Sequence, residues 1–98
     1  MLINTNTTGE VLNIALSGRL DTTTAPELEG KLSEVLEGVK DLVFDLKELE
    51  YISSAGLRVL LATQKTMNKV GTMKVVNVAP SVMEVFEITG FVDILTIE

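Results

Sequence analysis

Strand-type and helix-type patterns of hydrophobic residues alternate along this chain, and that alternation restricts its fold more than any other feature. Apolar residues occupy alternate positions from 12 to 16, as in a half-buried strand, and recur at helical spacing from 28 to 36. The nearly continuous apolar run 42–46 is typical of a central strand covered on both faces. Over the whole chain, these patterns predict the order β-β-α-β-α-β-α-β. This order predicts an α/β fold with a largely parallel sheet, an antiparallel first strand at its edge, and helices packed on it.

Turn and cap residues set the expected boundaries of these elements. Residues 6–9 are expected to form the turn between the first two strands. Thr24 and Glu27 have the spacing of a capping box at the start of the first helix, and Gly38 follows as its stop. The later elements are expected as an extended segment at 51–52, a helix from near 54 to about 70, a strand at 74–78, a helix at 80–89 and a final strand at 92–97.

Composition excludes several classes of function. With 98 residues, the chain is expected to be a single domain, 1–98. It contains no cysteine and no histidine, which removes disulfides, thiol chemistry, and the commonest general base and metal ligand. The net charge is −6 and the Lys and Arg residues are scattered, so direct binding of nucleic acid is not expected. The longest apolar run, 59–62, is too short for membrane insertion, and the N-terminus lacks a signal-peptide pattern, so a cytoplasmic location is expected.

Three segments are expected to meet at one edge of the sheet. They follow predicted strands and comprise residues 18–23, 45–54 and 77–80. Ligands and partners of open α/β sheets bind at the carboxyl ends of the parallel strands. A binding site is therefore expected where these segments meet.

The middle segment places Ser53 and Ser54 at the start of a helix. The free N–H groups and positive dipole end of a helix suit a phosphate, but a serine there is ordinarily just the N-cap, and these residues alone favour the cap. In the first half of this helix Arg58 is the only charged residue. Two interpretations of that apolar stretch stay open, a helix packed into the core and an apolar patch that a partner covers.

No arrangement of residues points to catalysis. A serine nucleophile needs a base within hydrogen-bond reach, and neither a G-x-S-x-G elbow nor a phosphate-binding G-x-x-x-x-G-K-[ST] loop is present. Asp21, Asp45 and Glu48 could in principle form a carboxylate cluster that binds a hard metal, but loop carboxylates are mostly solvated or cap helices. We expect no catalytic residue, no cofactor and no metal.

Residues 49–61, LEYISSAGLRVLL, closely resemble the signature of STAS domains, and specifically of bacterial anti-sigma factor antagonists. Residues 17–21 resemble the G-x-L-D segment of that family. Residues 44–46, followed by the serine loop, fit the family pattern in order and spacing. Residues 77–82 and the later segment 89–91 fit it as well. The resemblance covers essentially the whole chain and implies the STAS fold.

The resemblance also implies a mechanism. Antagonists of this family bind an anti-sigma factor when unphosphorylated and so release a sigma factor. The anti-sigma factor is typically an ATP-binding serine kinase that phosphorylates the antagonist and ends the complex, and a phosphatase resets it. Carried over by position, the phospho-acceptor is Ser54, with Asp21 beside it. The implied partner surface consists of Asp21, Thr22, Thr23, Ser53, Ser54, Ala55, Gly56, Leu57 and Arg58, although Leu57 is equally suited to the core.

Two residues depart from the family pattern. Ser53 stands where many members carry Asp, a carboxylate that would help to position or activate the acceptor hydroxyl. Ala55 replaces a frequent Ser or Thr, which leaves fewer candidate acceptors. An alternative function is a non-enzymatic scaffold or subunit, in a signalling complex or a lipid-transport ATPase. A third is nucleotide binding, for which the chain has no phosphate loop.

Overall fold

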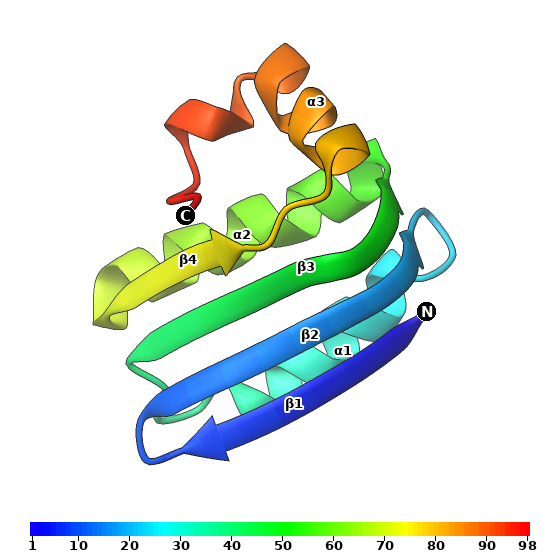
Figure 1. The fold of residues 1–98 in the computed structure, drawn as a ribbon. Coiled ribbons are helices and arrows are strands. Elements are labelled where there is room, and N and C mark those ends of the chain that lie inside the picture. Colours follow the sequence, from blue (N-terminus) through cyan, green and yellow to red (C-terminus); the bar gives the residue numbers. More distant parts are fainter.

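A four-stranded mixed sheet with the strand order β1-β2-β3-β4 forms the centre of the molecule (Figure 1). The structure is a computed structural model that describes all of residues 1–98. β1 (Leu2–Thr8) and β2 (Val11–Leu20) form an antiparallel hairpin, whereas β2 with β3 (Asp41–Ile52) and β3 with β4 (Thr72–Val76) are parallel pairs. The predicted α/β fold with an antiparallel edge strand is confirmed.

The β1–β2 turn is tighter than predicted. Asn6, Thr7 and Thr8 continue β1 and pair with residues of β2, so only Gly9 and Glu10 remain for the turn. Gly9 has a φ of 62°, a left-handed conformation that glycine adopts without a steric penalty. The prediction of a turn over 6–9 is therefore wrong for three of its four residues. The threonines behave instead as the strand-forming residues that their branched side chains favour.

Three α-helices accompany the sheet, namely α1 (Ala25–Val35), α2 (Ser54–Val70) and α3 (Pro80–Thr89). α1 and α2 lie behind the sheet in Figure 1, and α3 lies at its β4 side. α2 and α3 match the ranges predicted from the sequence. α2 ends at Gly71, where a Cβ atom would overlap the carbonyl oxygen of Lys40, and α3 ends at Gly90, with a φ of 81°.

The helices α1 and α2 cover one face of the sheet, which corrects the expectation that residues 42–46 are covered on both. Leu42, Phe44 and Leu46 are buried, but Val43 and Asp45, which point to the opposite face, are only half-buried. Only one face of β3 is fully buried. The run 42–46 is nearly continuous in apolar residues because Val43 lies on the open face between buried neighbours. β3 is also longer than expected, because it continues through the predicted segment 51–52 with shifts in its register against β2.

The predicted final strand at 92–97 is wrong. Phe91–Asp93 form a 3-10 helix, η1, and only Ile97 makes a parallel bridge, to Val75 of β4. Local hydrogen bonds account for this difference. The N–H groups of Ile94 and Leu95 both donate to the carbonyl oxygen of Phe91, at 3.0 and 2.8 Å, so they are not available to a sheet.

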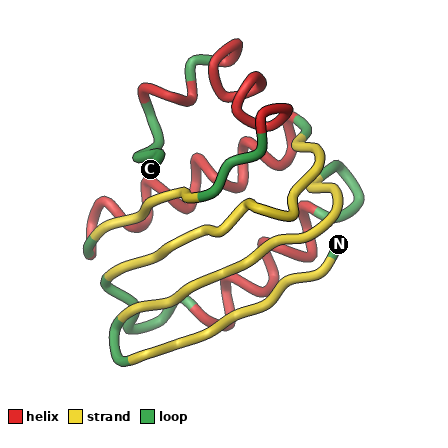
Figure 2. The backbone as a smooth tube through the Cα atoms, viewed as in Figure 1, coloured by secondary structure: helices red, strands yellow, loops and turns green.

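Twenty-two buried hydrophobic side chains form one core cluster to which the sheet and all three α-helices contribute. Phe44 and Phe86 are the largest of its fully buried members. None of the helices combines the length and the apolar character needed to span a bilayer. The loops that follow β2, β3 and β4 lie toward the same end of the sheet (Figure 2), which is where a site was expected.

Candidate functional site

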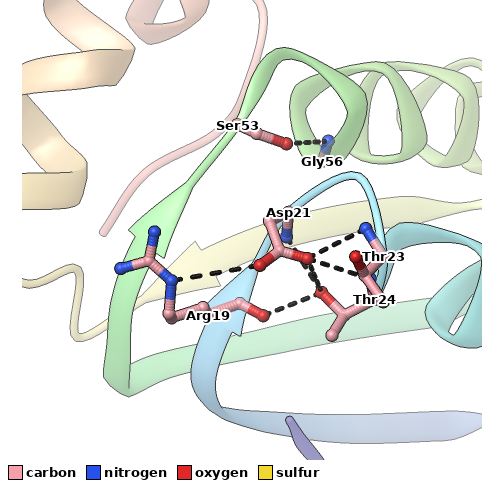
Figure 3. Close-up of polar contacts among 6 residues, drawn as sticks. All are labelled: Arg19, Asp21, Thr23, Thr24, Ser53 and Gly56. Carbon is pink, nitrogen blue, oxygen red and sulfur yellow. Dashed lines mark hydrogen bonds and ion pairs between the residues drawn. The ribbon is translucent and has the colours of Figure 1, made fainter.

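The carboxyl ends of β2 and β3 bring two of the predicted segments together. Leu20 pairs with Ile52, and the N–H of Ser53 donates to the carbonyl oxygen of Leu20 at 2.8 Å. The loop that begins at Asp21 therefore lies beside the start of α2 (Figure 3).

The third segment, after β4, joins the same strand further along. The side-chain amide of Asn77 donates to Asp45 Oδ1 at 3.2 Å, and the Ser81 hydroxyl donates to the carbonyl oxygen of Glu50 at 3.3 Å. These contacts attach the segment to β3 and not to the serine pair. The site is thus formed by the β2–α1 loop and the start of α2.

Asp21 organises the β2–α1 loop through backbone hydrogen bonds (Figure 3). Its Oδ1 accepts from the N–H groups of Thr23 at 3.0 Å and Thr24 at 3.1 Å. The Thr24 hydroxyl in turn accepts from the N–H of Asp21 at 2.9 Å and donates to the carbonyl oxygen of Arg19 at 2.8 Å. These bonds connect residues 19–24 into one hydrogen-bonded loop.

The predicted capping box of Thr24 and Glu27 is wrong. Thr24 is the N-cap residue, but its side chain makes no hydrogen bond to the helix. Its backbone is already helical, with φ −92° and ψ −19°, whereas a capping serine or threonine normally has an extended backbone. The hydroxyl is engaged within the loop instead, as described above.

The same contacts keep Asp21 ionised. The hydrogen bond from the N–H of Thr24 lowers the pKa of this carboxyl most. The N–H of Thr23, the Thr24 hydroxyl and the charge of Arg19 lower the pKa further, whereas desolvation raises it. Arg19 Nε lies 3.9 Å from Asp21 Oδ2, and its guanidinium stacks 4.2 Å from the ring centroid of Tyr51. Asp21 is therefore a fixed negative charge beside the start of α2.

The two serines have different roles. Ser53 is the N-cap of α2: its backbone is extended, and its hydroxyl accepts from the N–H of Gly56 at 3.3 Å. Ser54 is the first helical residue, and it is exposed. The question of which serine caps the helix is thus answered by geometry. The Ser54 hydroxyl takes no part in the cap.

Gly56 allows α2 to start close to the strand ends. A Cβ atom at this position would lie 2.7 Å from Leu20 Cγ and 2.9 Å from Ile52 Cγ1. Real Cβ atoms are essentially never that close to a neighbour, so a side chain here would push the helix away from β2 and β3. The glycine thereby sets the distance between Ser54 and the Asp21 loop.

The apolar first half of α2 mostly belongs to the core. Leu57, Val59 and Leu60 are buried, and Leu57 has an exposed fraction of only 6%. Of the predicted partner surface, Leu57 and Gly56 therefore present little area in the free domain. The residues of that surface that lie at or partly at the surface are Asp21, Thr22, Thr23, Ser53, Ser54, Ala55 and Arg58.

A shallow groove of about 420 Å³ lies between α1 and α2, next to these residues. It is lined by Thr22, Ala25, Pro26 and Glu29 on one side and by Ala55, Arg58, Val59 and Ala62 on the other. Sequence reasoning missed the contribution of α1. The order of elements could have indicated that α1 lies beside α2. Two successive right-handed crossovers between neighbouring parallel strands place both helices on the same face of the sheet.

The carboxylates considered as metal ligands do not form a cluster. No group of three or more His, Cys, Asp or Glu side chains is arranged so that it could hold a metal ion. Asp45 Oδ1 accepts instead from the N–H of Lys47 at 3.0 Å and from Asn77.

Comparison with known proteins gives consistent relatives. BtrV of Bordetella bronchiseptica, assigned as an anti-sigma factor antagonist, is 40% identical over 89 residues, which cover 89% of this chain and 77% of BtrV. The anti-sigma-B factor antagonist of Bacillus subtilis is 34% identical over 87 residues, covering 88% of this chain and 80% of that protein.

Solved structures give the same result for the fold. An anti-sigma factor antagonist from Mycobacterium paratuberculosis superposes with a TM-score of 0.88 at 28% identity, covering 98% of this chain and 83% of that one. SpoIIAA, an anti-sigma factor antagonist solved in its unphosphorylated form, shares the fold with a TM-score of 0.77 at 20% identity, over 99% of this chain and 87% of that one. The model of the STAS domain matches residues 3–98. This chain belongs to the STAS domain family.

Proposed function

We propose that this protein is an anti-sigma factor antagonist that is switched by phosphorylation of Ser54. Unphosphorylated, it binds an anti-sigma factor and frees the sigma factor; phosphorylated by that anti-sigma factor, acting as a serine kinase, it dissociates. One observation carries the proposal: Ser54 is exposed at the start of α2, which lies beside the Asp21 loop, while the hydroxyl of Ser53 alone caps the helix.

The relatives support this role. Two proteins named as anti-sigma factor antagonists align with nearly nine-tenths of this chain at 40% and 34% identity. SpoIIAA, which shares the fold, has also been solved in a phosphorylated form. A phosphate is therefore compatible with a domain of this architecture.

The site explains how a phosphate would break the complex and leave the fold intact. Phosphoserine adds a charge of about −1.5 to −2, and on the first residue of a helix this charge meets the positive end of the dipole. A partner that covers Ser54 must desolvate this charge next to ionised Asp21. An unpaired buried charge costs about 3–5 kcal/mol, which corresponds to a loss of affinity of a hundredfold or more.

The proposed role requires no catalysis by this chain. The kinase supplies the phosphoryl transfer, and a phosphatase removes the phosphate. The antagonist contributes the acceptor hydroxyl and the surface around it. Such a protein acts in the cytoplasm, where sigma factors are found.

The proposal is tested by incubating the protein with candidate anti-sigma kinases and ATP, followed by mass spectrometry of its peptides. Ser54→Ala should abolish phosphorylation. Ser53→Ala is the matched control, because it removes the neighbouring hydroxyl and the cap but keeps the acceptor, and it should only slow the reaction. Phosphate found mainly on Ser53, Thr22 or Thr23 would contradict the assignment.

A further inference from the structure

β1 leaves one edge of the sheet without a partner. It is the outermost strand (Figure 2) and pairs only with β2. Six of its seven residues are exposed. The opposite edge, β4, is paired at Val75 with the C-terminal segment. There the N–H of Val75 donates to the carbonyl oxygen of Thr96 at 2.8 Å, and the N–H of Glu98 donates to that of Val75 at 2.9 Å.

The free edge lacks the features that protect exposed strands. Soluble proteins usually place a charge, a proline or a bulge on such a strand to prevent pairing with another chain. Leu2–Thr8 has the sequence LINTNTT, with no charged residue, no proline and no glycine, although 22% of the whole chain is charged. All seven residues pair with β2 in one continuous register, so the strand is regular from end to end.

We propose that a second copy of this chain pairs with this edge, β1 against β1 and antiparallel, to form a two-fold symmetric dimer with a continuous eight-stranded sheet. A two-fold axis requires a self-complementary surface. The register that pairs all seven residues is centred on Thr5, which then faces Thr5 of the other copy. The proposal does not depend on the proposed function.

The side chains of β1 suit that register. Asn4 of one copy faces Asn6 of the other, and because opposite residues of an antiparallel pair point to the same face, these amides meet on the open face of the sheet. Carboxamide side chains both donate and accept, so the pair can hydrogen-bond to itself. The Thr5 pair lies on the other face, where threonine pairs favour strand association.

Electrostatics favours a second copy on this edge over other surfaces of the molecule. Each copy carries a net charge of −6, which opposes self-association through any charged face, but β1 brings no charge to the contact. The remaining repulsion acts at long range and is screened by salt. The dimer should therefore become stronger as the salt concentration rises.

The test is sedimentation equilibrium of the full chain and three variants from about 10 μM to about 1 mM, a range that detects weak dimers. The unmodified protein should form dimers, with a dissociation constant that falls between about 50 and about 500 mM NaCl. The double substitutions Asn4→Lys with Asn6→Lys, and Asn4→Glu with Asn6→Glu, place like charges opposite each other and should each weaken the dimer tenfold or more. An equimolar mixture of the two should restore it as a heterodimer.

The double lysine variant is the stricter test. Its smaller net negative charge reduces the overall repulsion between two copies, so only the local contact between like charges on β1 would account for its dissociation. Asn13→Lys is the matched control: it lies next to Asn6 on the open face, but on β2, and should leave the dimer intact. Circular dichroism checks that every variant is folded. A protein that stays monomeric at every concentration and salt would overturn the proposal, as would a dimer that persists in both double variants.

Discussion

The backbone N–H of Ser53 donates to the carbonyl oxygen of Leu20 over 2.8 Å, and this bond joins the start of α2 to the strand end that carries Asp21. Both proposed switch residues are thus positioned by the backbone of their neighbours. Substitution of the Ser54 side chain should change the chemistry of the site and leave its frame in place, whereas the Asp21 side chain also holds its own loop.

Ser53→Ala should destabilise the domain, and Ser54→Ala should not. Loss of an N-cap side chain costs about 1 kcal/mol, and here the hydroxyl of Ser53 is the one that accepts from Gly56. Removal of an exposed hydroxyl that takes no part in the cap should stay within about 0.5 kcal/mol. Chemical denaturation of both variants measures the difference in the free energy of unfolding. Equal losses would show that both serines support the helix start.

Gly56→Ala should destabilise the domain by about 1–3 kcal/mol, the range found for overpacking a filled core, because a Cβ there approaches Leu20 and Ile52 too closely. Gly30→Ala in α1 is the matched control. Apart from its chain neighbours and the backbone of its own helix, no heavy atom lies within 4 Å of its Cβ position, and alanine in a helix is favoured over glycine by about 0.5–1 kcal/mol. Opposite changes in the free energy of unfolding are expected, and a loss in both variants would contradict this account.

Asp21→Asn should remove a pH-dependent part of the stability. The pKa of Asp21 lies below its usual value of 3.8, so the folded state favours the ionised form. This contribution is present above the unfolded pKa and is lost as the pH falls through the lower, folded pKa. The variant should therefore be less stable than the original protein at neutral pH, and the two should converge as the pH falls below the folded pKa of Asp21. Urea denaturation as a function of pH tests this, and a constant difference down to acidic pH would disprove it.

Arg58→Glu should weaken binding to the anti-sigma factor by about tenfold or more, which is about 1.4 kcal/mol, without unfolding the domain. Arg58 is exposed and lines the groove between α1 and α2. Lys40→Glu is the control, since it makes the same charge change at an exposed residue just before β3, at the opposite end of the sheet from the site. Isothermal titration calorimetry measures both affinities. Unchanged affinity for Arg58→Glu would place the interface elsewhere.

Phosphorylation of Ser54 should leave the stability unchanged or raise it by about 0.3–1 kcal/mol, the usual effect of a negative charge at a helix N-terminus. For a domain of this size, 1 kcal/mol corresponds to a shift in Tm of about 4–8 °C. Thermal unfolding and hydrogen exchange of the phosphorylated and unmodified proteins give the comparison. A fall in Tm together with faster exchange in α2 would instead indicate an order–disorder switch.

The elements best predicted from the sequence are those with local boundaries. α3 begins at Pro80 and ends at Gly90, and both residues restrict the backbone whatever their surroundings. Thr24 shows the limit of local reasoning. Its hydroxyl had two sets of partners within a few residues, the helix start and the Asp21 loop, and only the backbone conformation decides between them.

Features that depend on distant contacts were not predictable from patterns. Val43 lines the same hollow as Thr96 and Glu98 of the C-terminal segment, so its cover depends on a distant part of the chain, and no spacing within residues 42–46 records that. The groove next to the serines forms only because α1 and α2 lie side by side. The sequence around Pro26 and Glu29 therefore gives no indication that these residues line it. The placement of the Ser53–Ser54 pair was predictable, because the order of strands and helices alone brings it to the end of β3.

Ser53 caps α2 and Ser54 does not, and this difference also has a kinetic consequence. Under the proposed mechanism, modification of Ser54 would consume no hydrogen bond of the cap, so a kinase or a phosphatase would reach this residue in the native state. Neither proposed reaction would have to wait for a local unfolding event. The speed at which such a signal is set and erased would then be determined by the amounts of the two enzymes, and the domain itself would add no delay.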